Sequence, residues 1–192
     1  MRKQWTLVIV IVLGLGIGAW ALTRYGNRSQ PPEVGNMAPN FRALNLRTGD
    51  TVSLGKTYKG QVVLVNIWGT FCVPCRAEMP AMEKLYRELG PRGFRIAAVS
   101  VDEGDTRDVL KFADEFKLTF DILHDGDGSV QRAFETTMFP ESFLVNQAGV
   151  IVKKAIGEHP WSSESNRRLV AELLGVNLGP APAAPLTTKP GG

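Results

Sequence analysis

Residues that crosslink chains or bind metals are scarce in this sequence of 192 residues, which contains two cysteines and two histidines. A fold held together by disulfides carries more cysteines at wider spacing. A structural zinc site usually has four ligands, and His124 and His159 lie 35 residues apart. We therefore expect no disulfide scaffold, no metal site and no bound cofactor.

A clustered basic face is also lacking, although the formal net charge is +3. Arg2, Lys3, Arg24 and Arg28 all lie at the N-terminal end, and removing these four leaves 18 basic residues against 19 acidic ones. Binding to a phosphate backbone usually needs a run or patch of basic residues, and none occurs after Arg28. We therefore expect no nucleic-acid partner.

One long apolar segment stands near the start of the chain. No charge occurs from Trp5 to Leu22, WTLVIVIVLGLGIGAWAL, and this length nearly spans the ~30 Å hydrocarbon core of a bilayer. Ala19-Trp20-Ala21 also fits a signal-peptide cleavage site, so a cleaved signal sequence is the alternative. Because the run is longer than a usual signal core and aromatic residues flank it, we predict an uncleaved transmembrane anchor over residues 1–22.

The orientation of this anchor is less well defined, because two basic residues precede the apolar run and two come after it. A first helix with a basic head usually keeps its N-terminus in the cytoplasm and exports the rest of the chain. We therefore expect a single-pass protein of the cytoplasmic membrane, with its domain on the extracytoplasmic, periplasmic side.

Composition divides the rest of the chain into three parts. Residues 23–36 are polar and rich in Gly and Pro, which is typical of a linker. Residues 177–192 form a Pro/Ala-rich tail with too few large apolar residues to pack, and we predict that it is disordered. Residues 37–176 are long enough for one domain with a substantial core.

Hydrophobic periodicity in this domain predicts strands that alternate with helices and then a hairpin. The expected strands are 51–54, 62–68 and 94–101, with hairpin strands 142–146 and 150–154; the expected helices are 74–89, 106–117, 129–134 and 162–174. Such an order fits a mixed central sheet in an α/β sandwich.

The two cysteines, Cys72 and Cys75, stand three positions apart where a predicted strand gives way to a predicted helix. Unpaired backbone N–H groups and the helix dipole favour an anion there, and hence the thiolate of Cys72. We expect Cys72 to attack a partner disulfide and the shielded Cys75 to resolve the mixed disulfide. An inert local disulfide and half of a zinc site are the alternatives.

Three segments together resemble the TlpA/ResA/CcmG group of thioredoxin-like proteins. They are VVLVNIWGTFCVPCRAEMP from Val62 to Pro80, Ala38-Pro39-Asn40-Phe41, and FPESFLV from Phe139 to Val145. The resemblance covers about residues 35–174. It implies a thioredoxin-like α/β fold, with a central mixed sheet flanked by helices and an N-terminal β-hairpin extension, here after an N-terminal transmembrane helix.

The resemblance also implies an activity. Members of this group are membrane-anchored thiol-disulfide oxidoreductases that often reduce apocytochrome c in cytochrome c biogenesis. By this resemblance the chain is a dithiol reductase of protein disulfides that uses the redox-active disulfide Cys72–Cys75 and no other cofactor. Its electrons would come from a membrane thiol donor of the CcdA or DsbD type, and we expect a monomer.

For the surroundings of the cysteines, the resemblance implies that the Phe139–Pro140 peptide bond is cis and lies against the disulfide. Phe71, which replaces a more common Trp, and Phe139 would form an aromatic wall that binds substrate. Backbone groups beside Pro140 would pair with an extended substrate peptide.

Two departures from the group's pattern concern proton transfer. Asn66 stands where thioredoxin has a buried Asp, and Val73 stands where ResA-type proteins have a Glu. Glu103 aligns with a second acid of the ResA-type site and is the predicted proton-transfer group. The alternative is that Glu103 is a solvated residue of an acidic loop.

Two other functions remain open. A peroxiredoxin would have Thr three residues before its reactive cysteine, but Gly69 stands there. Catalytic consumption of peroxide would favour the peroxiredoxin hypothesis. A non-enzymatic copper chaperone on the same fold would have a CxxxC pair with a positioned histidine, and this spacing is shorter. Tight one-to-one binding of Cu(I) would favour the chaperone.

Overall fold

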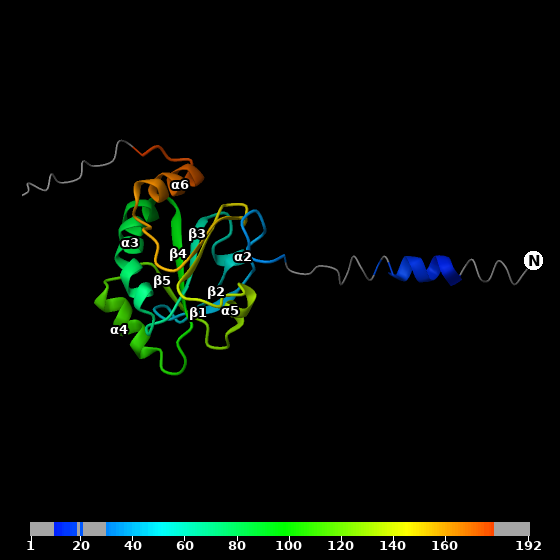
Figure 1. The fold of residues 1–192 in the computed structure, drawn as a ribbon, viewed down its shortest axis with the longest axis horizontal. Helices are drawn as coiled ribbons and strands as arrows, with labels where there is room; N and C mark the ends of the chain where they lie inside the picture. The colour runs from blue at the N-terminus through cyan, green and yellow to red at the C-terminus, as the bar shows by residue number, and fades with distance from the viewer. Residues whose placement is uncertain (1–9, 19, 21–29, 179–192) are drawn as a thin grey trace, which may run out of the picture. The chain divides into compact units, whose positions relative to one another are not determined.

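The computed structural model of the protein describes residues 10–18, 20 and 30–178 (Figure 1). The chain divides into two units, one up to Gln30 and one from Pro31. In the first unit, residues 10–18 are helical and their apolar side chains are exposed. Within the described ranges, no helix combines the length and the apolar character needed to cross a membrane.

The rest of the predicted anchor 1–22 and most of the predicted linker 23–36 and tail 177–192 lie outside the described residues. The last residues of the predicted linker, 31–36, belong to the second unit, which begins at Pro31. The Gly35 N–H donates to the Ile151 carbonyl and the Ile151 N–H to the Asn36 carbonyl, both at 2.9 Å. Such pairing uses only the backbone, so the polar composition did not reveal it.

One mixed sheet of seven strands, in the order β2-β1-β5-β4-β3-β6-β7, organises the second unit. The interior strand β3 pairs parallel with β4 and antiparallel with β6, and all its residues are buried. The strands are β1 (Arg42–Asn45), β2 (Thr51–Ser53), β3 (Val62–Trp68), β4 (Phe94–Ser100), β5 (Asp121–His124), β6 (Glu141–Val145) and β7 (Ile151–Ile156).

Helices cover both faces of the sheet (Figure 1). Those on one face pack through a cluster that includes Leu64, Met79 and Phe112, and those on the other through a cluster with Val65 and Val130. The first face carries α3 (Val73–Leu89), α4 (Arg107–Glu115) and α6 (Glu164–Leu174), and the second carries α2 (Leu54–Thr57) and α5 (Ser129–Ala133). A short 3-10 turn, η1 (Gly90–Arg92), comes after α3. This is the thioredoxin-like arrangement that the sequence predicted.

Alternation along β3 decides what lies under α3. Successive side chains of a strand point to opposite faces, so Leu64 and Trp68 join the cluster beneath α3 while Val65 and Ile67 join the opposite one. Asn66 shares the register of Leu64 and Trp68. The strand therefore carries one fully buried polar side chain towards α3.

The predicted strands and helices from residue 51 onwards are present, with ends that move by one or two residues. The antiparallel pair of β1 and β2 is the N-terminal β-hairpin that the resemblance implied, whereas hydrophobic periodicity predicted neither β1 nor β5. Their sequences, RALN and DILH, are four residues long and begin or end on polar residues. β1 pairs with β2 as well as with β5, and β5 pairs also with β4. Their own local pattern is too short to predict them.

Phe143→Ala tests the core on the α2 and α5 face. Phe143 is fully buried and its ring centroid lies 4.8 Å from that of Phe134. We expect the substitution to lower the free energy of unfolding by about 3–5 kcal/mol, measured by denaturant titration of the oxidised protein. Val34→Ala, at an exposed residue, is the control and should change it by less than about 0.5 kcal/mol. Equal effects of the two substitutions would contradict this packing.

Candidate active site

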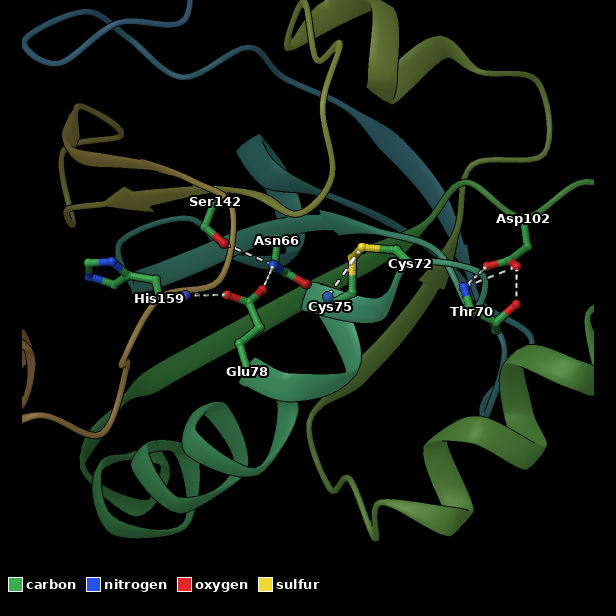
Figure 2. Close-up of a disulfide and its surroundings, with 8 residues drawn as sticks. All are labelled: Asn66, Thr70, Cys72, Cys75, Glu78, Asp102, Ser142 and His159. Atoms are coloured by element: carbon green, nitrogen blue, oxygen red, sulfur yellow. Dashed lines mark hydrogen bonds between the residues drawn. A yellow bond between two sulfur atoms is a disulfide. The ribbon is translucent and has the colours of Figure 1, made fainter.

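The cysteine pair lies where β3 ends and α3 begins. Cys72 is the N-terminal capping residue of α3, and its sulfur accepts a hydrogen bond from the Cys75 backbone N–H at 3.2 Å. The two sulfurs form a disulfide with an S–S distance of 2.04 Å (Figure 2). The structure thus places Cys72 at a helix N-terminus, where unpaired backbone N–H groups favour an anion.

The two cysteines differ in exposure. Cys72 is 7% exposed and Cys75 is fully buried. The two residues next to Cys72 in the chain, Phe71 and Val73, expose large apolar side chains. A partner can therefore approach only Cys72, and the surface it meets there is apolar.

The Phe139–Pro140 peptide bond is cis, as the resemblance implied. The Phe71 ring meets the Phe139 ring edge to face, with centroids 6.1 Å apart. The structure therefore brings the residue before Cys72 and the residue before the cis proline together into one aromatic wall.

The loop that leads to Cys72 is fastened by a carboxylate. The Thr70 backbone N–H donates to both oxygens of Asp102 at 3.1 and 3.0 Å, and the Thr70 hydroxyl donates to the same group. Figure 2 shows the hydrogen bonds between Thr70 and Asp102. The Ser100 hydroxyl also donates to Asp102, at 2.7 Å. A Cβ atom on Gly69 would lie 2.5 Å from the Phe71 ring, so this turn requires glycine while Phe71 keeps its place.

Glu103 lies exposed beyond this loop. It lines an open pocket of about 430 Å³ together with Phe71, Asp102, Gln131, Val101 and Phe139. The structure thus brings Glu103 to the edge of the aromatic wall and leaves its side chain in solvent, whereas Cys75 is buried.

The carboxyl group buried near the cysteines is Glu78, three residues after Cys75 on α3 and 1% exposed. Its Oε1 accepts a hydrogen bond from Asn66 Nδ2 at 2.8 Å, and its Oε2 accepts one from the His159 backbone N–H at 3.2 Å. Asn66 Nδ2 also donates to the Ser142 hydroxyl at 2.8 Å. Figure 2 shows this network beside the disulfide.

Burial raises the pKa of Glu78 from its ordinary 4.5 to about 7. The hydrogen bonds from Asn66 and His159 favour the charged form and oppose the shift. The indole of Trp161 also favours the charged form, although its nitrogen makes no hydrogen bond of normal geometry. At neutral pH, Glu78 is therefore populated both as acid and as carboxylate, which suits a group that exchanges protons.

Sequence reasoning included Glu78 in the matched segment but gave it no role. The helical pattern did contain a signal for the burial of Glu78, because Glu78 lies on α3 near Met79 and Met82, which face the sheet. Its burial depends on the chain around His159, 81 residues further along, and that approach cannot be read from local periodicity.

A more enclosed hollow of about 300 Å³ lies elsewhere, between residues of α2 such as Leu54, the β6–β7 turn and the start of β3. The cysteines come after the opposite end of β3. Since the disulfide, the cis proline and the buried acid lie together at that end, we place the active site there.

Comparison with known proteins decides the family. Residues 33–171 match the Redoxin family model. The chain belongs to the redoxin family. Within the family it is 32% identical over 157 residues to the thiol-disulfide oxidoreductase ResA of Bacillus cereus, which covers 82% of this chain and 89% of that protein. It is 35% identical to the thioredoxin-like protein YneN of Bacillus subtilis, over 82% of this chain and 92% of that one.

Solved redoxin-like structures agree with this. A putative thiol:disulfide interchange protein DsbE from Chlorobium tepidum superimposes with a TM-score of 0.66 at 27% identity, over 74% of this chain and 99% of that one. This redoxin is therefore a thiol-disulfide oxidoreductase of the ResA/DsbE type.

The pKa of Glu78 predicts how stability depends on pH. Because the pKa of Glu78 is raised in the folded protein, this carboxyl group loses its proton at a lower pH in the unfolded chain than in the folded one. Relative to Glu78→Gln, the wild-type free energy of unfolding should fall by about 3 kcal/mol as pH rises from about 4.5 through about 7. Denaturant titrations of the oxidised proteins across this range measure it. A constant difference would contradict the assignment, and Glu172→Gln, at an exposed residue, is the control.

Asp102→Ala should loosen the loop before Cys72. It removes an ionised acceptor of hydrogen bonds from Thr70 and Ser100, so we expect a loss of about 2 kcal/mol in the free energy of unfolding and slower exchange with a small disulfide. Asp105→Ala, in the same loop but exposed, is the control. Unchanged stability and exchange rate in Asp102→Ala would show that the carboxylate does not hold this loop.

Proposed function

We propose that this protein is an extracytoplasmic dithiol reductase, held at the cytoplasmic membrane by its N-terminal segment, that reduces the disulfide of apocytochrome c before haem attachment. One observation carries the proposal: Cys72, at a helix N-terminus and 7% exposed, is paired with a fully buried Cys75 that has a buried acid one turn away. The similarity to ResA and DsbE proteins supports the reaction type.

In the proposed reaction, the Cys72 thiolate attacks one sulfur of the substrate disulfide. A mixed disulfide forms, and the other substrate sulfur leaves as a thiolate that takes up a proton. The Glu78 carboxylate then accepts the proton of Cys75, whose thiolate attacks the Cys72 sulfur. The second substrate sulfur is released as a thiolate that takes up a proton, so the substrate leaves as a dithiol and the enzyme is left with the Cys72–Cys75 disulfide.

We assign the proton transfer to Glu78 instead of Glu103, which the sequence had suggested. Glu78 is buried on the same helix as Cys75 and has a pKa of about 7, whereas Glu103 is exposed on a loop. Glu103 then lies at the rim of the substrate surface with Phe71 and Phe139.

The exposed surface around Cys72 supports a peptide substrate. Phe71 and Phe139 provide an aromatic wall, and backbone groups next to Pro140 would pair with an extended segment that brings its sulfur to Cys72. A membrane thiol donor of the CcdA or DsbD type would return the enzyme disulfide to the dithiol and become oxidised itself. The protein would act as a monomer.

Trapping tests this function. Cys75→Ser removes the thiol that resolves the mixed disulfide, so we expect full-length Cys75→Ser protein to accumulate covalent adducts in cells, with apocytochrome CxxCH segments identified in them by mass spectrometry. Cys72→Ser is the matched control and should form none. Adducts that contain no apocytochrome would overturn the assignment of apocytochrome c as the substrate. The absence of any adduct would overturn the reductase mechanism.

A further inference from the structure

A buried hydrogen-bond acceptor lies unused beside the disulfide. Asn66 is 0% exposed, and its Oδ1 has no hydrogen-bond partner among the described residues. Its Nδ2 is fully used, because it donates to Glu78 and to Ser142, both at 2.8 Å. Leaving a buried acceptor unpaired is unfavourable, so this atom calls for an explanation.

The orientation of the Asn66 amide is set by its neighbours. Turning the amide over would take both Nδ2 N–H groups away from the Glu78 and Ser142 oxygens, and it would leave Oδ1 facing Glu78, which can donate only while protonated. The two N–H groups therefore face Glu78 and Ser142, and the oxygen must face the other way. Figure 2 shows that it points towards Cys75.

Cys75 changes its hydrogen-bonding capacity with its redox state. In the disulfide its sulfur carries no proton. In the dithiol it carries an S–H group, a weak donor, in a fully buried position where water cannot serve as acceptor. The unpaired Asn66 oxygen of the oxidised protein thus points towards the residue that gains a donor on reduction.

We propose that Asn66 is a positioning residue that accepts a hydrogen bond from the Cys75 thiol in the reduced protein through Oδ1, while its two N–H groups hold Glu78 beside that thiol. The inference rests on the proposed function for its role in the cycle. Reduction by a donor dithiol breaks the Cys72–Cys75 bond with two electrons and two protons, and the donor becomes a disulfide. One of these protons, on Cys75, completes the hydrogen bond.

The hydrogen bond favours the dithiol, because it pairs an acceptor that the disulfide form leaves unpaired. Loss of the Asn66 side chain should therefore shift the equilibrium with glutathione towards the enzyme disulfide about tenfold, which corresponds to a reduction potential about 30 mV more negative. Ser142→Ala disturbs the same amide but leaves Oδ1 in place, so it is the matched control and should change the equilibrium by less than about twofold.

Infrared spectroscopy tests the hydrogen bond directly. The chain has two cysteines, so Cys72→Ser leaves Cys75 as the only thiol. We expect its S–H stretching band to move to higher frequency and to narrow in Cys72→Ser/Asn66→Ala, because the acceptor is lost, and to stay in place in Cys72→Ser/Ser142→Ala. An S–H band that is the same in all three proteins would overturn the proposal.

A second measurement needs no substitution at Asn66. The ¹³Cγ resonance of the Asn66 amide should shift downfield when the wild-type protein is reduced, and an unchanged resonance would count against the hydrogen bond even if Asn66→Ala fails to fold. Neither spectrum involves a substrate. A failure of this inference is therefore distinguishable from a failure of the trapping experiment, which tests the proposed function.

Discussion

The burial of one carboxyl group, Glu78, is the constraint on which the rest of this site depends. A carboxylate removed from water must be hydrogen-bonded or must take up a proton, and here both occur. Asn66 and the His159 backbone supply donors, while burial keeps the pKa near 7. The polar residue in β3, the strand β6 behind it and the chain near His159 are thus tied to one group beside the disulfide.

Around this buried acid, the site separates into two parts with different physical requirements. The outer part is apolar and open, with Phe71 at 66% exposure, which suits contact with many peptide sequences. The inner part is polar, dry and fixed by hydrogen bonds of 2.8 Å. The disulfide joins them, because Cys72 reaches the surface and Cys75 does not. Under the proposed mechanism, substrate contact and proton transfer would take place on opposite sides of one bond.

Much of the fold could be predicted from the sequence, because its main elements are long and strongly patterned. The continuous apolar run of β3 and the helical spacing of α3 are enough to predict that the cysteine pair lies between them. The role of Glu78 could not be predicted in the same way. A glutamate one turn after a cysteine on a helix is usually solvated, and its burial requires the approach of residues near His159, 81 positions away. Glu103 was favoured by motif alignment, which carries no information about exposure.

The turn at Gly69 has a consequence for how this scaffold can evolve. A side chain there would meet the Phe71 ring, since a Cβ atom would lie 2.5 Å from it. The threonine that a peroxide-reducing relative would carry at this position could be acquired only if the aromatic ring moved away from Phe139. Under the proposed function, these rings contact the substrate peptide, so a threonine at residue 69 would disturb substrate contact at residue 71.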